Sequence, residues 1–166
     1  MKKYYSGFTL IELVIYIGIL ALLLGMLSSI FTSIIDVQLE STATSSVNQD
    51  GRYILAKLTN DFQANNPVSL KDPTVPGSTS ASLRININNN IVDTTYAVAN
   101  GKLTRTDSQG TDAINSYDTS VSNFKTTRIG LGGADTVQVS FTLTGLTKER
   151  SGYETKTFQS TFTATN

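Results

Sequence analysis

One stretch near the start of the chain, residues 8–35, is almost entirely apolar. Glu12 is its only charged residue, and the weakly acidic phenol of Tyr16 is its only other ionisable group. As an α-helix this stretch would be about 42 Å long, at 1.5 Å per residue. Because about 20 residues suffice to cross the roughly 30 Å hydrocarbon core of a membrane, we predict a transmembrane helix whose outer end emerges or is tilted.

The charges that flank this stretch predict its orientation. Lys2 and Lys3 precede it, whereas Asp36 and Glu40 follow it. Because lysines favour the cytoplasmic side of a membrane, we expect the short N-terminal tail in the cytoplasm and the rest of the chain outside.

Two ordinary explanations compete for such a segment. A secretory signal peptide has an apolar region of about 7–15 residues before its cleavage site. Residues 41–43 imitate a cleavage site, but the apolar run before them is too long. An ordinary single-pass anchor fits the length and leaves Glu12 unexplained, because a carboxylate inside a membrane costs a few kcal/mol and usually has a partner and a function.

The N-terminal motif carries a specific resemblance. The sequence GFTLIEL at residues 7–13, preceded by a short basic leader, resembles the class III signal of type IV pilins and type II secretion pseudopilins. The resemblance implies that residues 1–7 are a leader peptide, cut after Gly7 by prepilin peptidase, and that the new N-terminus at Phe8 is methylated. A glycine before the cut leaves the scissile peptide sterically accessible.

Cleavage would also supply a partner for Glu12. The resemblance implies that the free amine of Phe8 in one subunit pairs with Glu12, the fifth residue of the mature chain, in its neighbour. A desolvated carboxylate is stabilised by an opposite charge in good geometry, so Phe8 and Glu12 are the predicted assembly residues.

Small residues in the apolar stretch suggest a helix-packing face. Ala21 and Gly25 form a small-xxx-small pair, with Gly18 three residues before Ala21, and such residues let helices approach closely. Glycine and alanine are also simply common in membrane helices. Many major pilins have a kinking proline in this part of the helix, where this chain has Ser28 and Ser29. We therefore expect a straighter helix.

Residues 36–66 are expected to continue the same helix as an amphipathic second half. The apolar positions with helical spacing are Val47, Ile54, Leu55, Leu58 and Phe62, and Gly51 falls on the same stripe. Asp50, Arg52, Lys57 and Asp61 are expected largely on the other faces. The sequence at residues 65–67, Asn-Asn-Pro, should end a helix of about 55 residues.

Residues 67–166 predict a β-rich extracytoplasmic domain. Residues 67–80 contain all three prolines and are expected to be a loop. Alternating apolar residues or turn signals predict strands at residues 83–87, 94–98, 102–106, 121–127 and 137–143, with a last strand around Phe158 and Phe162. Asn100 and Gly101 signal a tight hairpin, and turns are expected at residues 107–116 and 145–152. The predicted fold class is α+β, with the long helix packed on an antiparallel β-sheet.

A finer resemblance concerns the subunit type. Residues 52–62 and residues 96–105 resemble the stalk and the first hairpin of J-type pseudopilins and W-type minor pilins. This resemblance favours a minor subunit, placed with other minor pilins in a tip complex that primes assembly.

Other chemistry has weaker support. The glycines in residues 130–133 lack the lysine of a phosphate loop and are expected to form a hairpin turn. Asp107, Asp112 and Asp118 could suggest calcium, which some pseudopilins bind, but their spacing lacks the order of a calcium loop, so no cofactor is expected. Glu149 and Glu154 are expected to be surface charges rather than paired catalytic carboxylates.

Composition narrows the function further. The chain has 166 residues, no His, no Cys and a formal net charge of zero. A net charge of zero does not favour nucleic-acid binding, which requires a basic surface. Without His and Cys, the chain lacks the usual general base of enzymes and the thiolate ligands of metal sites. We therefore predict a structural subunit rather than an enzyme, located in the cytoplasmic membrane and then in an extracellular filament. The expected partners are prepilin peptidase, other major and minor pilins, a membrane assembly platform and the lipid bilayer.

Alternatives remain open from the sequence. The chain could be a major pilin, or the same helix could present a membrane-tethered binding or adhesin module. An anchored enzyme is disfavoured because no catalytic constellation is visible.

Overall fold

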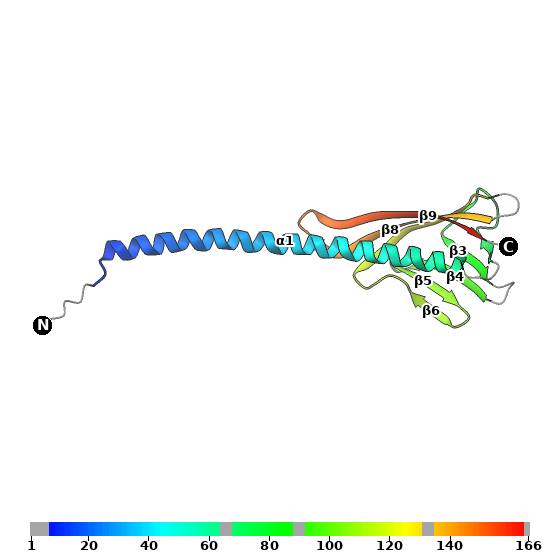
Figure 1. Ribbon diagram of the computed structural model, residues 1–166, viewed down its shortest axis with the longest axis horizontal. Helices are drawn as coiled ribbons and strands as arrows, with labels where there is room; N and C mark the ends of the chain where they lie inside the picture. The colour runs from blue at the N-terminus through cyan, green and yellow to red at the C-terminus, as the bar shows by residue number, and fades with distance from the viewer. Residues whose placement is uncertain (1–6, 64–67, 88–91, 131–134, 165–166) are drawn as a thin grey trace. The chain divides into compact units, whose positions relative to one another are not determined.

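The computed structural model describes residues 7–63, 68–87, 92–130 and 135–164. One helix, α1 (Leu10–Gln63), is followed by nine strands (Figure 1). The strands are β1 (Val68–Asp72), β2 (Thr79–Ser80), β3 (Ser82–Ile87), β4 (Val92–Ala99), β5 (Lys102–Asp107), β6 (Gly110–Ala113), β7 (Thr119–Arg128), β8 (Asp135–Glu149) and β9 (Gly152–Ala164). The contacts divide the chain within α1, between Gln38 and Leu39, into two units.

The helix confirms the predicted length, since α1 runs for 54 residues without a break. Ser28 and Ser29 do not interrupt it. The hydroxyls of Ser29 and Thr32 donate to the backbone carbonyls of Met26 and Ser28, at 2.7 and 3.0 Å, so these polar groups are satisfied within the helix. The residues predicted to stop the helix, 65–67, lie outside the described residues.

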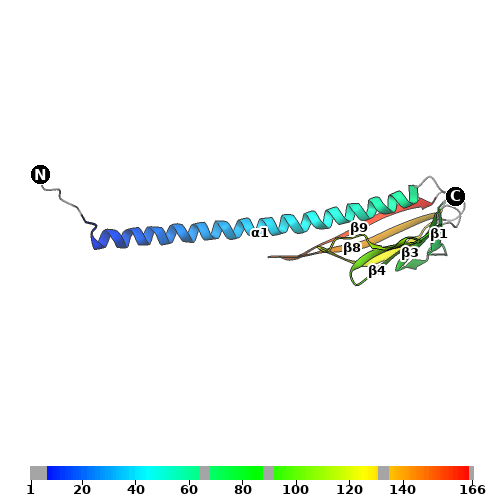
Figure 2. The ribbon, with the colours of Figure 1, turned by 90° about the horizontal axis from the view of Figure 1, so that it is seen from below.

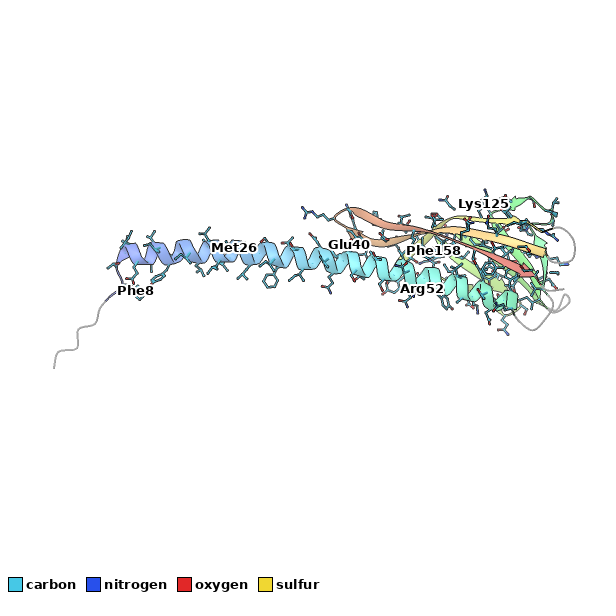
Figure 3. All side chains as sticks on the ribbon, turned by 45° about the horizontal axis from the view of Figure 1, so that its top comes forward. Phe8, Met26, Glu40, Arg52, Lys125 and Phe158 are labelled. Carbon is cyan, nitrogen blue, oxygen red and sulfur yellow. The ribbon has the colours of Figure 1, made fainter. Side chains whose placement is uncertain are left out.

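The first unit presents apolar side chains to its surroundings. From Phe8 to Ile35 the large apolar side chains are between 49% and 82% exposed, and Figure 3 shows them projecting from the helix. By length and composition α1 is able to cross a membrane. Lipid or other apolar helices would remove this surface from water.

The second unit contains two antiparallel sheets. β1-β3-β4-β5-β6 form one sheet and β2-β7-β8-β9 form the other. Thr126 on β7 donates its hydroxyl to the carbonyl of Ser82 on β3 at 2.7 Å, which joins the two sheets. The predicted α+β fold with antiparallel strands is confirmed. We expected one sheet, and the structure has two, because alternation along the sequence does not reveal which strands pair.

The strand predictions hold best where a turn is chemically specified. Asn100 and Gly101 both have positive φ, 52° and 74°, as the two central residues of a type I′ hairpin require. Residues 67–80 were expected to form a loop, but β1 and β2 lie there. Likewise β6 occupies part of the turn-rich residues 107–116. The turn expected at residues 145–152 is shorter, because β8 continues to Glu149 and β9 begins at Gly152.

The second half of α1 packs on the sheets through the predicted stripe. Val47, Ile54 and Leu58 have no exposed surface, and the rings of Phe62 and Phe162 stack with centroids 5.1 Å apart. Gly51 faces the ring of Phe158 so closely that an added Cβ would overlap the ring. Figures 1 and 2 show this part of α1 lying along β8 and β9.

The prediction that Asp50 and Asp61 lie largely on other faces of the helix is wrong. They are only 8% and 5% exposed. Both are buried because the domain supplies hydrogen-bond donors to them, which offsets the cost of removing a carboxylate from water.

Asp61 joins the end of α1 to the β4–β5 hairpin. Its carboxylate accepts hydrogen bonds from the Tyr96 hydroxyl at 2.5 Å and from Nε of Arg105 at 2.8 Å. Burial, together with the hydrogen bond to Asp61, raises the pKa of Tyr96. Burial alone would lower the pKa of Arg105, but its bonds to Asp61 and Asp107 outweigh this and raise that pKa. The phenol therefore remains a donor and the guanidinium remains charged.

Asp50 organises the loop before β7. Its carboxylate accepts from the backbone N–H and the hydroxyl of Ser116, both at 2.8 Å, and from the hydroxyl of Thr119. The loop is also held by Lys102, whose ammonium donates to the carbonyl of Ser116. The helix thus fixes a loop that is distant in sequence.

The ion pair at the end of α1 gives a first prediction. Asp61→Asn replaces one of the two carboxylates that pair with the largely buried guanidinium of Arg105 by a neutral amide, so the free energy of unfolding should fall by about 1–3 kcal/mol. The matched control is Asp93→Asn, which alters the exposed Arg84–Asp93 pair and should cost much less. Urea unfolding of the full chain in detergent, followed by circular dichroism, measures both, and equal losses would contradict the assigned role of Asp61.

The close approach at Gly51 gives a second prediction. Gly51→Ala gains helix propensity but forces the Phe158 ring to move, so a net loss of about 1–2 kcal/mol is expected. Because Leu is smaller at that contact, adding Phe158→Leu should make the double variant more stable than the sum of the two single losses predicts. Additive losses in the same unfolding assay would show that the two residues do not constrain each other.

Candidate assembly site

The helix begins with a capping arrangement. Thr9 precedes α1, its side-chain oxygen accepts the N–H of Glu12 at 3.3 Å, and its carbonyl accepts the N–H of Leu13 at 3.2 Å. A threonine followed three residues later by glutamate is the capping-box pattern, which satisfies N–H groups that a helix start leaves without partners. The helix therefore starts two residues after the predicted cut.

Glu12 lies in the first turn of α1, where a negative charge is favoured by the helix dipole. Its side-chain contact is with Tyr16, one turn later, whose hydroxyl donates to Oε1 of Glu12 at 3.4 Å. The ring of Tyr16 also meets the ring of Phe8 edge to face, with centroids 5.8 Å apart. Among the described residues, none of the ion pairs includes Glu12.

The predicted processing residues are open to approach. Gly7 and Phe8 are both exposed, Phe8 by 72%, and Figure 3 marks Phe8 at the start of α1. A Cβ added at Gly7 would meet no described atom within 4 Å. The basic leader residues Lys2 and Lys3 lie outside the described residues.

The predicted helix-packing residues lie on the exposed half of α1. At Gly18 and Gly25 a Cβ would meet no described atom within 4 Å. Close packing of a second helix over these glycines and Ala21 remains a prediction.

Two residues near Glu12 were given no role from the sequence. Thr9 is the cap and Tyr16 is the phenol donor. Two spacings in the sequence could have indicated these roles. Glu12 follows Thr9 by three residues, as in a capping box, and Tyr16 follows Glu12 by four residues, which places both side chains on one helix face.

Of the three acidic residues considered for calcium, Asp107 has a carboxylate that other groups of the chain already bind. Asp107 accepts from the backbone N–H of Gln109 at 2.8 Å and from Arg105, and these bonds lower its pKa. Asp112 lies opposite Arg105 in the β5–β6 register. The carbonyl of Asp118 accepts the N–H of Leu146. Among described residues no group of three or more metal-ligating side chains comes together.

The two glutamates considered as paired carboxylates lie on either side of the turn that joins β8 and β9. Glu149 is the last residue of β8, and Glu154 is in the first part of β9. Glu149 accepts a hydrogen bond from the hydroxyl of Ser151 at 3.3 Å.

Comparison with known proteins bears on the N-terminal segment. The family model described as the prokaryotic N-terminal methylation motif matches residues 2–28. The match therefore includes residues 2–7 of the predicted leader, Phe8, Glu12 and the first part of α1. No curated protein and no solved structure matches the chain at a significant level.

Proposed function

We propose that this chain is a type IV pilin-like or pseudopilin subunit, because its N-terminal segment matches the methylation motif, and that it is a minor pilin which polymerises through its N-terminal helix. Prepilin peptidase cuts between Gly7 and Phe8, and the new N-terminus is methylated. The helix holds the subunit in the cytoplasmic membrane, with the β-rich domain outside, until the subunit enters a filament. The proposed role is structural and not enzymatic.

The observation that carries this proposal is the lone carboxylate of Glu12 on an exposed apolar helix. A charged group at that depth in lipid is costly unless an opposite charge reaches it, and no ion pair of the described residues includes it. The amine created at Phe8 by cleavage is a cation at the same level of a neighbouring helix. Pairing between subunits would satisfy both groups.

The exposed surface of α1 supports the same role. Its exposed apolar side chains must be kept from water. Lipid does this before assembly, and neighbouring helices do it afterwards. Because lipid tails are as apolar as these side chains, helix association depends on close packing and on polar pairs rather than on the hydrophobic effect. Gly18, Ala21 and Gly25 would supply the packing and Glu12 the polar pair.

The minor role rests on the resemblance of residues 52–62 and 96–105 to minor subunits. Three residues of those segments, Asp61, Tyr96 and Arg105, form the cluster that joins α1 to the β4–β5 hairpin. A minor role also implies that the subunit is scarce beside a dominant subunit in isolated filaments.

Substitution of Glu12 tests the proposal. Glu12→Ala and Glu12→Val should insert in the membrane normally, because they make the helix more apolar. Their incorporation into filaments should fall at least tenfold, since the neighbour's amine then lacks its partner. The measurement is the ratio of chain in sheared filaments to chain in membranes, by quantitative immunoblot.

The matched control is Glu40→Ala, which removes the next glutamate along the chain, beyond the apolar stretch. It should enter filaments like the wild type. Normal incorporation of Glu12→Ala would overturn the proposed pairing.

A further inference from the structure

Three polar side chains are concentrated at the start of α1. From Phe8 to Leu27, the side chains that contain oxygen or nitrogen are those of Thr9, Glu12 and Tyr16. Thr9 is engaged in capping the helix. This leaves one carboxyl group and one phenol, spaced by four residues, within an apolar segment.

The geometry of a helix directs these two groups toward each other. Residues four apart lie on one face, and side chains lean toward the N-terminus, so Tyr16 points back over Glu12. The phenol of Tyr16 is 3.4 Å from Oε1 of Glu12, and its ring rests against that of Phe8. Glu12 and Tyr16 thus share a face of α1, and the ring of Phe8, just before the helix, packs against Tyr16.

A membrane makes this pairing more consequential than it would be in water. A phenol and a carboxyl group in hydrocarbon each need a partner, and water does not supply one there. One turn after Glu12, Tyr16 provides a hydroxyl, whereas the hydroxyl of Thr9 is engaged in the helix cap. The hydrogen bond gives the phenol an acceptor within its own chain and gives one oxygen of the carboxyl a donor.

We propose that Tyr16 is a positioning residue for Glu12. Its phenol donates to one oxygen of the Glu12 carboxyl, and its ring packs on Phe8, which together hold the carboxyl on the face where a neighbouring subunit's amine arrives. Because a carboxylate accepts several hydrogen bonds, the second oxygen remains available to that amine. This inference rests on the proposed function and assigns a role to Tyr16.

The test is a double-substitution cycle read as filament incorporation in the full chain. Tyr16→Phe keeps the ring and removes only the hydroxyl, so incorporation should fall about three- to tenfold. Combined with Glu12→Ala, Tyr16→Phe should cause no additional loss, because the residue it positions is gone. The control, Ser29→Ala, removes another hydroxyl from the same helix and should leave incorporation unchanged.

Outcomes of this cycle separate the two proposals. Full incorporation of Tyr16→Phe, or a loss that multiplies with that of Glu12→Ala, would overturn the positioning role while leaving the proposed function intact. Normal incorporation of Glu12→Ala would overturn both the positioning role and the proposed pairing of Glu12 with the neighbour's amine.

A spectroscopic measurement reports on the hydrogen bond itself. In lipid vesicles, the infrared difference between wild type and Glu12→Gln isolates the carboxyl stretch of Glu12. The same difference, recorded in a Tyr16→Phe background, should show that stretch shifted in frequency, because a hydrogen bond from the phenol is lost. An unshifted stretch would overturn the positioning role.

Discussion

An unbroken backbone hydrogen-bond ladder along α1 is the constraint on which the rest of this chain depends. Within hydrocarbon every backbone N–H and C=O must be satisfied inside the segment, which a continuous helix achieves. The same helix continues from Leu39 to Gln63, where its buried stripe forms one side of the domain core. One element therefore serves two environments, with exposed apolar side chains in its first unit and an amphipathic face in its second.

Carboxylates determine how each half of α1 is used. In the second unit, Asp50 and Asp61 are buried with donors from the loop before β7 and from the β4–β5 hairpin, so they attach the helix to particular strands. In the first unit, Glu12 has a phenol beside it and takes part in no ion pair with the residues that the structure describes. A buried carboxylate with two or three donors from its own domain stabilises a fold, whereas a carboxylate with one donor retains the capacity to bind another chain.

Much of this arrangement could be predicted from local patterns. Apolar length predicted the membrane-type helix, helical spacing predicted the Val47–Phe62 stripe, and the pair Asn100 and Gly101 predicted its hairpin. The burial of Asp50 and Asp61 could not be predicted, because their donors lie at least 35 residues away in sequence. β6 was missed because it is exposed and has no apolar alternation, and β1 was missed because its short alternation lies in the proline-containing residues 67–80. At the assembly site Tyr16 was noted only as a weakly acidic phenol.

The most direct test of the central claim is mass spectrometry of the N-terminal peptide from sheared surface filaments. A peptide that begins at Phe8 with a methylated amine, recovered in trace amounts beside a dominant subunit, is the predicted result. Protein confined to membranes with residues 1–7 intact would contradict the claim, because such a chain would be an ordinary anchored domain that creates no amine for a neighbour's Glu12.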